Sequence, residues 1–265
     1  MNINAVDMDL KLNDQRFIVC GASSGFGQGI AQALLEEGAR IVAIARRGGR
    51  LRDIYSEYTN RVEVIEGDIT REETRDHIEE SAKKEPFHGV VLNTGGPPTG
   101  TPLETDMEQW DDAWQLVMRW KIDLSLRLAP LLAKQGYGRI LYVESKSVKQ
   151  PIPILVLSNS FRAGVVGFAK SLATDIASSG VTVNVMAPGP HDTPAIERII
   201  RTNSKKEGIS LDEARDRVHH STPVGRMGTA AEFASLASWI LSPHSAFVTG
   251  QTISHDGGSI AGLFG

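Results

Sequence analysis

The most constraining feature of the chain is an apolar run that breaks at a glycine- and serine-rich turn and resumes as a helical pattern. The run Phe17–Cys20 leads directly into Gly21-Ala22-Ser23-Ser24-Gly25-Phe26-Gly27. A strand, a tight turn and a helix in this order bring unpaired backbone N–H groups to a helix N-terminus, where the helix dipole favours an anion. The three glycines would allow the turn, the close approach of a pyrophosphate and close packing of the helix on the strand. The sequence therefore predicts a dinucleotide site formed by Gly21, Ser23, Ser24, Gly25, Phe26 and Gly27.

The same turn has a second interpretation, because Gly21-Ala22-Ser23-Ser24-Gly25 matches the Gly-x-Ser-x-Gly elbow of serine hydrolases. Such an elbow follows an interior strand, whereas this turn follows the first strand of the chain and adds Gly27. The position favours the nucleotide loop over the nucleophile elbow.

Composition narrows the class of protein further. The chain has 265 residues, of which 41% are apolar, enough for one large core of the open α/β kind. The net charge of −4 comes without a basic stripe, so nucleic acid is not an expected partner. The single Cys20 cannot form an internal disulfide, residues 1–14 lack the apolar run of a leader, and no apolar run could cross a bilayer. We expect a cytoplasmic protein that does not enter membranes.

Short β-rich runs alternate with longer helical patterns, as in successive βαβ units. The expected strands are Arg16–Cys20, Arg40–Ala45, Val62–Glu66, Gly89–Leu92, Arg139–Val143, Val181–Val185 and Gln251–Ser254. The expected helices are Gly27–Glu37, Arg71–Lys84, Met107–Lys134, Asn159–Ser178 and Ala230–Leu241. Several strands are almost continuously apolar, which indicates a parallel sheet covered on both faces. The prediction is one doubly wound α/β domain over residues 1–265, with a predominantly parallel seven-stranded sheet and helices on both faces.

Residues 191–228 depart from this rhythm as a long, charged insertion. Ser210 and Glu213 form a candidate capping box for a short helix through Arg217. Connections of this length inside compact domains are often lids, so we expect 191–228 to be a substrate lid rather than a solvated excursion.

Taken together, these features resemble the short-chain dehydrogenase/reductase family over essentially the whole chain, with its motifs in the family's order. Cys20 to Gly27 fits the Thr-Gly-x-x-x-Gly-x-Gly loop, with Cys20 in place of Thr. Thr249-Gly250-Gln251 and Asp256-Gly257-Gly258 match the family's closing strand. The resemblance implies a Rossmann-type fold, adenine contacts by Asp68 and Ile69, a sheet-steadying turn at Asn93 and Gly95, and a nicotinamide turn at Pro188, Gly189 and Thr193. Within the family it resembles a divergent, 3-oxoacyl-carrier-protein-reductase-like branch whose members lack the usual active-site residues.

Cofactor choice can be argued from charge. A carboxylate at the tip of the second strand would bind the ribose hydroxyls of NAD, whereas an Arg suits the 2′-phosphate of NADP. Here that strand ends Ala45-Arg46-Arg47, with no carboxylate. Arg46 and Arg47 therefore favour NADP(H) over NAD(H), because a guanidinium binds phosphate through charge-assisted hydrogen bonds.

The resemblance fails at the active site. The family uses an Asn, a Ser, and a Tyr and Lys spaced Tyr-x-x-x-Lys on one helix. Alignment of this chain places Val117, Ser145, Ser158 and Arg162 at those four positions. A literal Tyr142-x-x-x-Lys146 lies on a strand, where residues four apart are separated by ~13 Å rather than the ~6 Å of a helix. We treat that match as coincidence.

A serine and an arginine cannot imitate a phenol of lowered pKa. Ser145 and Ser158 could still donate hydrogen bonds to a carbonyl oxygen, and Arg162 could hold ribose or an anionic substrate. The proton could then come from His191, from Lys149, or from water relayed by the serines. His191 could instead hold a loop, and Lys149 could be a solvated loop charge. The histidines show no metal-ligand spacing, so no metal is expected.

Three functions follow. The leading one is an NADP(H)-dependent carbonyl reductase or alcohol dehydrogenase with an atypical active site, acting on a small carbonyl or alcohol substrate. The alternatives are a non-catalytic NADP(H)-binding sensor or assembly protein, and a non-redox lyase or isomerase using the same pocket. The helix Asn159–Ser178 is apolar nearly all round, which in this family implies a homodimer or homotetramer.

Overall fold

The computed structural model describes residues 8–263 and places seven parallel strands in one sheet, in the order β3-β2-β1-β4-β5-β6-β7. The strands are β1 (Arg16–Cys20), β2 (Arg40–Ala45), β3 (Val62–Glu66), β4 (Gly89–Leu92), β5 (Gly138–Val143), β6 (Val181–Pro188) and β7 (Thr252–His255). The order reverses between β1 and β4, the topological switch point at which ligands bind in open α/β sheets. The predicted doubly wound Rossmann-type fold is confirmed.

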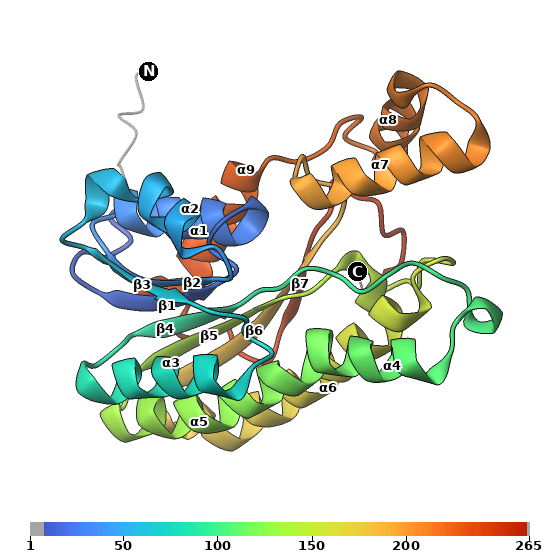
Figure 1. Ribbon diagram of the computed structural model, residues 1–265. Coiled ribbons are helices and arrows are strands. Elements are labelled where there is room, and N and C mark those ends of the chain that lie inside the picture. The colour runs from blue at the N-terminus through green and yellow to red at the C-terminus, as the bar shows by residue number, and fades with distance from the viewer. Residues whose placement is uncertain (1–7, 264–265) are drawn as a thin grey trace.

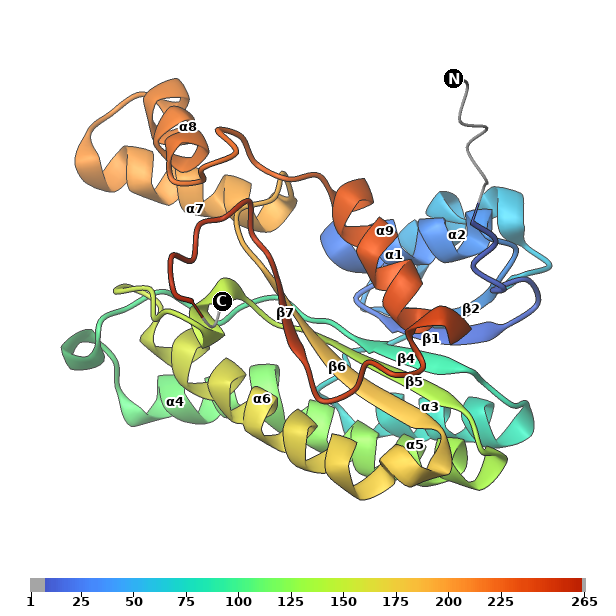
Figure 2. The same cartoon turned by 180° about the vertical axis from the view of Figure 1, so that it is seen from behind.

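Helices cover both faces of the sheet (Figure 1). One face carries α1 (Gly25–Glu36), α2 (Gly48–Ile54) and α9 (Ala230–Leu241), and Figure 2 shows α9 beside α1 from behind. The other face carries α3 (Glu72–Lys84), α4 (Met107–Ala113), α5 (Trp120–Gln135) and α6 (Val156–Ile176). Each layer has its own apolar cluster, because strand side chains alternate between the two faces: Ile18 packs toward α5 and α6, whereas Val19 packs toward α1 and α9.

The predicted elements are present, with corrections at their ends. The predicted helix Met107–Lys134 contains a π-helical stretch, Trp114–Arg119, between α4 and α5. Helix α6 begins at Val156, three residues before the predicted start, and β6 continues to Pro188 because β7 pairs with its last four residues. A π-helical stretch such as Trp114–Arg119 shifts the register of a helix, and such stretches are frequent at functional sites.

The segment 191–228 folds as two helices, α7 (Pro194–Glu207) and α8 (Leu211–His220), where the sequence predicted only one short helix. Pro194 is the first residue of α7, a position at which proline costs no hydrogen bond, and the Ser210 side chain accepts from the Glu213 backbone N–H at the start of α8. The pair projects beyond the carboxyl ends of the strands (Figure 1). It has a small core of its own, centred on Ile200, Ala214 and Met227.

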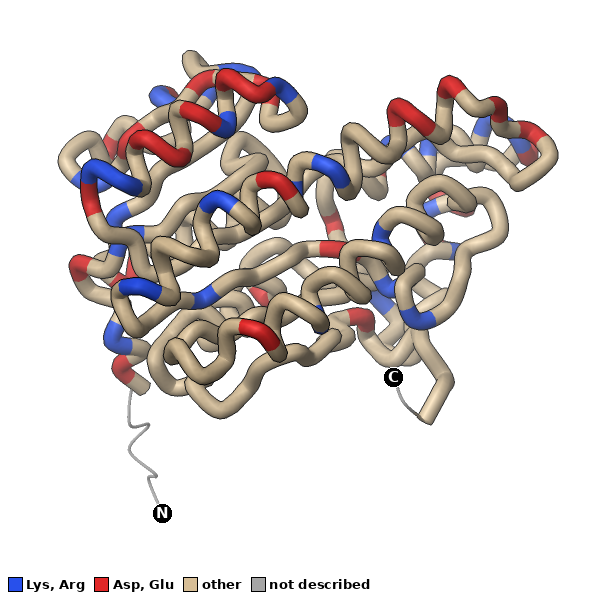
Figure 3. The backbone as a smooth tube through the Cα atoms, turned by 90° about the horizontal axis from the view of Figure 1, so that it is seen from below, with Lys and Arg blue, Asp and Glu red and all other residues tan. Residues whose placement is uncertain are grey.

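Positive and negative side chains are interspersed along the described chain (Figure 3). Among residues 8–263, no helix is long and apolar enough to cross a membrane. The expected absence of a leader rests in part on residues 1–7, which lie outside the described residues.

Candidate active site

A cleft of about 770 Å³ opens at the carboxyl edge of the sheet. Its walls come from the loops after β1, β2, β3, β4, β5 and β6, from the start of α6, and from α7. Every residue predicted from the sequence to bind cofactor or to act in catalysis lines this cleft, except Gly27 and Lys149. Segments far apart in the sequence thus converge on one site.

The glycine loop after β1 has the geometry that a pyrophosphate requires. Gly21 and Gly25 have φ values of +69° and +56°, in the left-handed region that favours glycine. Gly27 lies beneath the loop, where a Cβ would stand 2.3 Å from the Gly21 carbonyl oxygen. Helix α1 begins after Ser24 with no side-chain capping bond and no acidic residue in its first turn. Its N-terminal N–H groups are therefore available to an anion, and the loop fits a dinucleotide.

Arg46 and Arg47 lie exposed at the tip of β2 and line the cleft. Asp68, after β3, also lines it, and its Oδ1 accepts hydrogen bonds from the Thr70 backbone N–H at 3.0 Å and the Thr70 hydroxyl at 2.8 Å. Burial would raise the pKa of Asp68, but the Thr70 hydrogen bonds and the nearby Arg46 and Arg71 charges hold it below its usual value. Asp68 is therefore an ionised acceptor.

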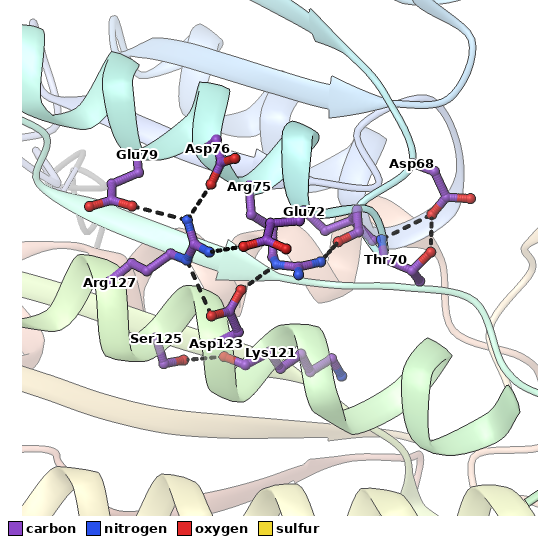
Figure 4. Close-up of polar contacts among 11 residues, drawn as sticks. Asp68, Thr70, Glu72, Arg75, Asp76, Glu79, Lys121, Asp123, Ser125 and Arg127 are labelled. Atoms are coloured by element: carbon purple, nitrogen blue, oxygen red, sulfur yellow. Dashed lines mark hydrogen bonds and ion pairs between the residues drawn. The ribbon is translucent and has the colours of Figure 1, made fainter. Parts of the chain in front are cut away.

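The turn that carries Asp68 is held by a network of charged residues on α3 and α5 (Figure 4). The buried Arg75 donates to the Ile69 carbonyl oxygen at 3.0 Å and pairs with Asp123 of α5. Asp123 also accepts from Arg127 of the same helix. These contacts fix the backbone of the turn after β3. The pairing of Arg75 with Asp123 could not be predicted from the sequence, because the two residues are 48 positions apart.

The loops after β4 and β6 also line the cleft. The Asn93 amide donates to the Cys20 carbonyl oxygen at 3.4 Å, and a Cβ on Gly21 would lie 2.7 Å from that amide. Thr193 lies against Gly25, since a Cβ there would be 3.7 Å from the Thr193 side chain. The two loops therefore pack directly on the glycine loop.

Ser145, Ser158 and Arg162 all line the cleft. Ser145 follows β5, and its hydroxyl accepts from the Ser147 backbone N–H at 3.1 Å. Ser158 and Arg162 are both buried on the first turns of α6, where the Arg162 Nε donates to the Ser158 hydroxyl at 3.0 Å. Because both serine oxygens accept from the protein, both hydroxyl protons remain available for an acceptor in the cleft. Val117, at the position of the family's Asn, is fully buried in the π-helical stretch.

Two buried charges that sequence reasoning missed hold Arg162 in place. Glu144 accepts from Arg162 Nη1 at 2.9 Å and also pairs with Lys121 of α5; the Glu144 and Lys121 side chains are 0% exposed. Burial, reinforced by the Arg162 charge, lowers the pKa of Lys121 to about 8 although Glu144 opposes this. The available signals were Lys121 on the apolar stripe with Leu124 and Leu128, and an acid directly after a buried strand.

The two side chains considered as proton sources, His191 and Lys149, have different surroundings. The His191 ring donates from Nδ1 to the Gly189 carbonyl oxygen at 3.0 Å, which leaves Nε2 to accept from His255 Nδ1 at 2.9 Å. Burial lowers the pKa of His191, so the ring is neutral. These contacts favour the loop-holding role. Lys149 is absent from the described walls of the cleft.

The literal Tyr142-x-x-x-Lys146 match is a coincidence, as expected. The fully buried Tyr142 hydroxyl bonds to Ser125 beneath the sheet, whereas the Lys146 ammonium donates to the Ser259 hydroxyl at 3.1 Å.

Comparison with known proteins gives the family. The family model described as enoyl-(acyl carrier protein) reductase matches residues 21–259. The 3-oxoacyl-(acyl-carrier-protein) reductase FabG of Vibrio cholerae is 29% identical over 252 residues, covering 94% of this chain and 98% of that protein. The NADPH-dependent reductase BacG of Bacillus subtilis is 26% identical over 253 residues, covering 92% and 97%. The structure of L-sorbose reductase from Gluconobacter frateurii with NADPH and L-sorbose superposes with a TM-score of 0.90 at 27% identity, covering 97% and 100%. The chain belongs to the short-chain dehydrogenase/reductase family.

Proposed function

We propose that the chain is an NADP(H)-dependent carbonyl reductase in which Ser145, Ser158 and Arg162 replace the family's usual proton donor. The observation that carries the proposal is the buried contact between Arg162 and Ser158 inside a cleft whose opposite end fits a dinucleotide. The expected preference for NADP(H) is confirmed by the relatives, two of which are described with NADPH.

The residues that would hold the cofactor follow from the geometry. The glycine loop and the α1 N-terminus would bind the pyrophosphate, Arg46 and Arg47 the 2′-phosphate, and Asp68 and Ile69 the adenine. Asn93, Gly95, Pro188, Gly189 and Thr193 would border the nicotinamide. The bound cofactor would supply the hydride.

The chain's own residues would stabilise and protonate the resulting alkoxide. The Ser145 and Ser158 hydroxyls point two donors at the carbonyl oxygen, and the Arg162 cation stabilises negative charge on it. An alkoxide and a serine hydroxyl have similar proton affinities, so Ser158 can pass its proton on and recover one from water in the open cleft. His191 and Lys149 are not needed as acids in this scheme.

The segment 191–228 would act as the substrate lid, because α7 supplies one wall of the cleft. The end of α7 lies near residues 101–104: hydrogen bonds from Thr101, with a smaller contribution from the Lys206 charge on α7, lower the pKa of Glu104. The apolar residues around α6 would fit a homodimer or homotetramer, and cytoplasmic location remains our expectation.

The test is a fluorescence titration with NADPH and NADH, followed by a carbonyl panel monitored for NADPH oxidation. Loss of one oxyanion donor costs roughly 10²–10³ in kcat, so Ser158→Ala should lose activity on that scale while NADPH binding persists. Ser171→Ala, at an exposed position of the same helix, is the matched control. Equal rates in wild type and Ser158→Ala would refute the assigned role. Tight binding without turnover of any carbonyl would favour the sensor, and activity without cofactor the lyase or isomerase.

A further inference from the structure

Helix α7 presents two different faces. Ile196 and Ile200 pack toward α8, and Glu197 pairs with Arg215 of that helix. The stripe at the complementary helical spacing lines the cleft: Ala195, Arg198, Ile199, Thr202 and Asn203. Arg198 is the only charged residue of this stripe.

Arg198 differs from Arg215 and Arg217 of the same segment, which have ion-pair partners, and from Arg201, which lies outside the cleft wall. Arg215 pairs with Glu197, and Arg217 pairs with Glu207 and Glu213. Within residues 8–263, the Arg198 guanidinium has neither an ion pair nor a hydrogen bond, and the residue is exposed to the cleft. Its charge is therefore available to a ligand.

The other charged groups that line the cleft are either paired or proposed to bind the cofactor. Asp68 accepts from Thr70, Glu144 pairs with Lys121 and Arg162, and Arg46 and Arg47 would bind the 2′-phosphate. The cleft wall also includes the apolar residues Leu116, Ile154, Leu155, Ile196 and Ile199. A ligand that fits this cleft and uses the Arg198 charge has an apolar body and one negative charge.

We infer that Arg198 binds a carboxylate of the substrate, so that the enzyme reduces oxo acids in preference to neutral carbonyl compounds. This inference rests on the proposed reductase function. A carboxylate suits the site because a single guanidinium can bind it through two hydrogen bonds, whereas a phosphate dianion would favour further cations on the stripe.

The experiment compares aliphatic oxo acids with the methyl esters of the same acids, in wild type and in Arg198→Gln. A charge-assisted hydrogen bond is worth about 1.5–3 kcal/mol, or roughly 10- to 100-fold, and the exposure of Arg198 points to the lower end. The wild type should prefer the acid in kcat/KM by about tenfold, and Arg198→Gln should bring the ratio close to one. Arg201→Gln removes the same charge from the same helix at a position outside the cleft wall, and it should leave the ratio unchanged.

A second readout separates this inference from the reductase proposal. Calorimetric titration of the NADP⁺-saturated protein with saturated carboxylates and their methyl esters measures anion binding without turnover. Tighter binding of the acids that is lost in Arg198→Gln supports the inference even if no carbonyl is reduced. Equal affinities for the acids and their esters, or no binding of either, would overturn the inference. Weaker NADPH binding by Arg198→Gln with an unchanged acid preference would assign Arg198 to a cofactor phosphate and also overturn it.

Discussion

Removal of the buried Lys121 charge should change how the stability of the protein depends on pH. Lys121 is fully buried, contacts Glu144, and lies within 5.8 Å of the centroid of the Trp120 ring. Its pKa is lowered from 10.5 to about 8, chiefly by burial. Methionine has a similar length and no charge, so Lys121→Met isolates this effect and leaves Glu144 paired with Arg162.

The magnitude follows from the two pKa values. The unfolded chain holds the proton up to about pH 10.5 and the folded chain only up to about pH 8. Between these values the unfolded state binds more protons, so the unfolding free energy of the wild type rises with pH. A difference of about 2.5 in pKa corresponds to roughly 3 kcal/mol, of which about three quarters should appear between pH 7 and pH 10.

Urea denaturation at a series of pH values measures this effect. The stability of the wild type relative to Lys121→Met should rise by roughly 2–3 kcal/mol from pH 7 to pH 10. Lys134→Met, at an exposed position of α5, is the control and should give a curve parallel to that of the wild type. Parallel curves for Lys121→Met and wild type would show that the buried ammonium is not penalised, and the reasoning would be refuted.

Three further predictions concern other buried positions. Gly27→Ala should lower the unfolding free energy by about 1–3 kcal/mol and weaken NADPH binding, because the new Cβ would meet the Gly21 carbonyl. Gly49→Ala is the control, since its Cβ would have open space around it, and its unfolding free energy should stay within about 0.5 kcal/mol of the wild type. Urea and fluorescence titrations measure both variants. Cys20 is 0% exposed, and burial raises its pKa to about 12. A thiol reagent should therefore leave Cys20 unlabelled in the native protein and label it fully in urea. Labelling of the native protein would contradict this prediction. Burial lowers the pKa of His191 below its usual 6.5, so as the pH falls through 6.5 the unfolded chain takes up the proton first and the unfolding free energy decreases. His191→Gln should therefore lose less unfolding free energy than the wild type between pH 7 and pH 5. An equal loss in both proteins would exclude His191 as the source of the pH dependence.

The fold could be predicted from the sequence because each element has a local signature. The apolar runs of β1 and β2 are continuous, and both strands begin and end at the predicted residues. Helix α9 also matches, since Thr229 and Glu232 form a capping box at its start. The extension of β6 to Pro188 has no local signature, because it depends on pairing with β7.

The presence of the glycine loop and of the β2 tip in one cleft could be predicted for the same reason, since each segment is contiguous in sequence. The contacts of Glu144 could not be predicted from the sequence. Lys121 and Arg162 reach it from α5 and α6, and no local pattern relates residues that meet only when three elements pack. The role of the ring nitrogens of His191 was open for the same reason, because His255 is 64 positions away.

The buried cluster also explains how a serine and an arginine could work where the family uses a tyrosine and a lysine. Lys121 and Arg162 carry two positive charges against the one negative charge of Glu144, so at neutral pH the cluster is cationic beneath the cleft. A fixed positive charge stabilises an alkoxide without rearrangement. The same charge would also lower the cost of ionising Ser158, whose hydroxyl accepts from Arg162. The proposed chemistry therefore depends less on a phenol of lowered pKa than on a cation held in place by a buried carboxylate.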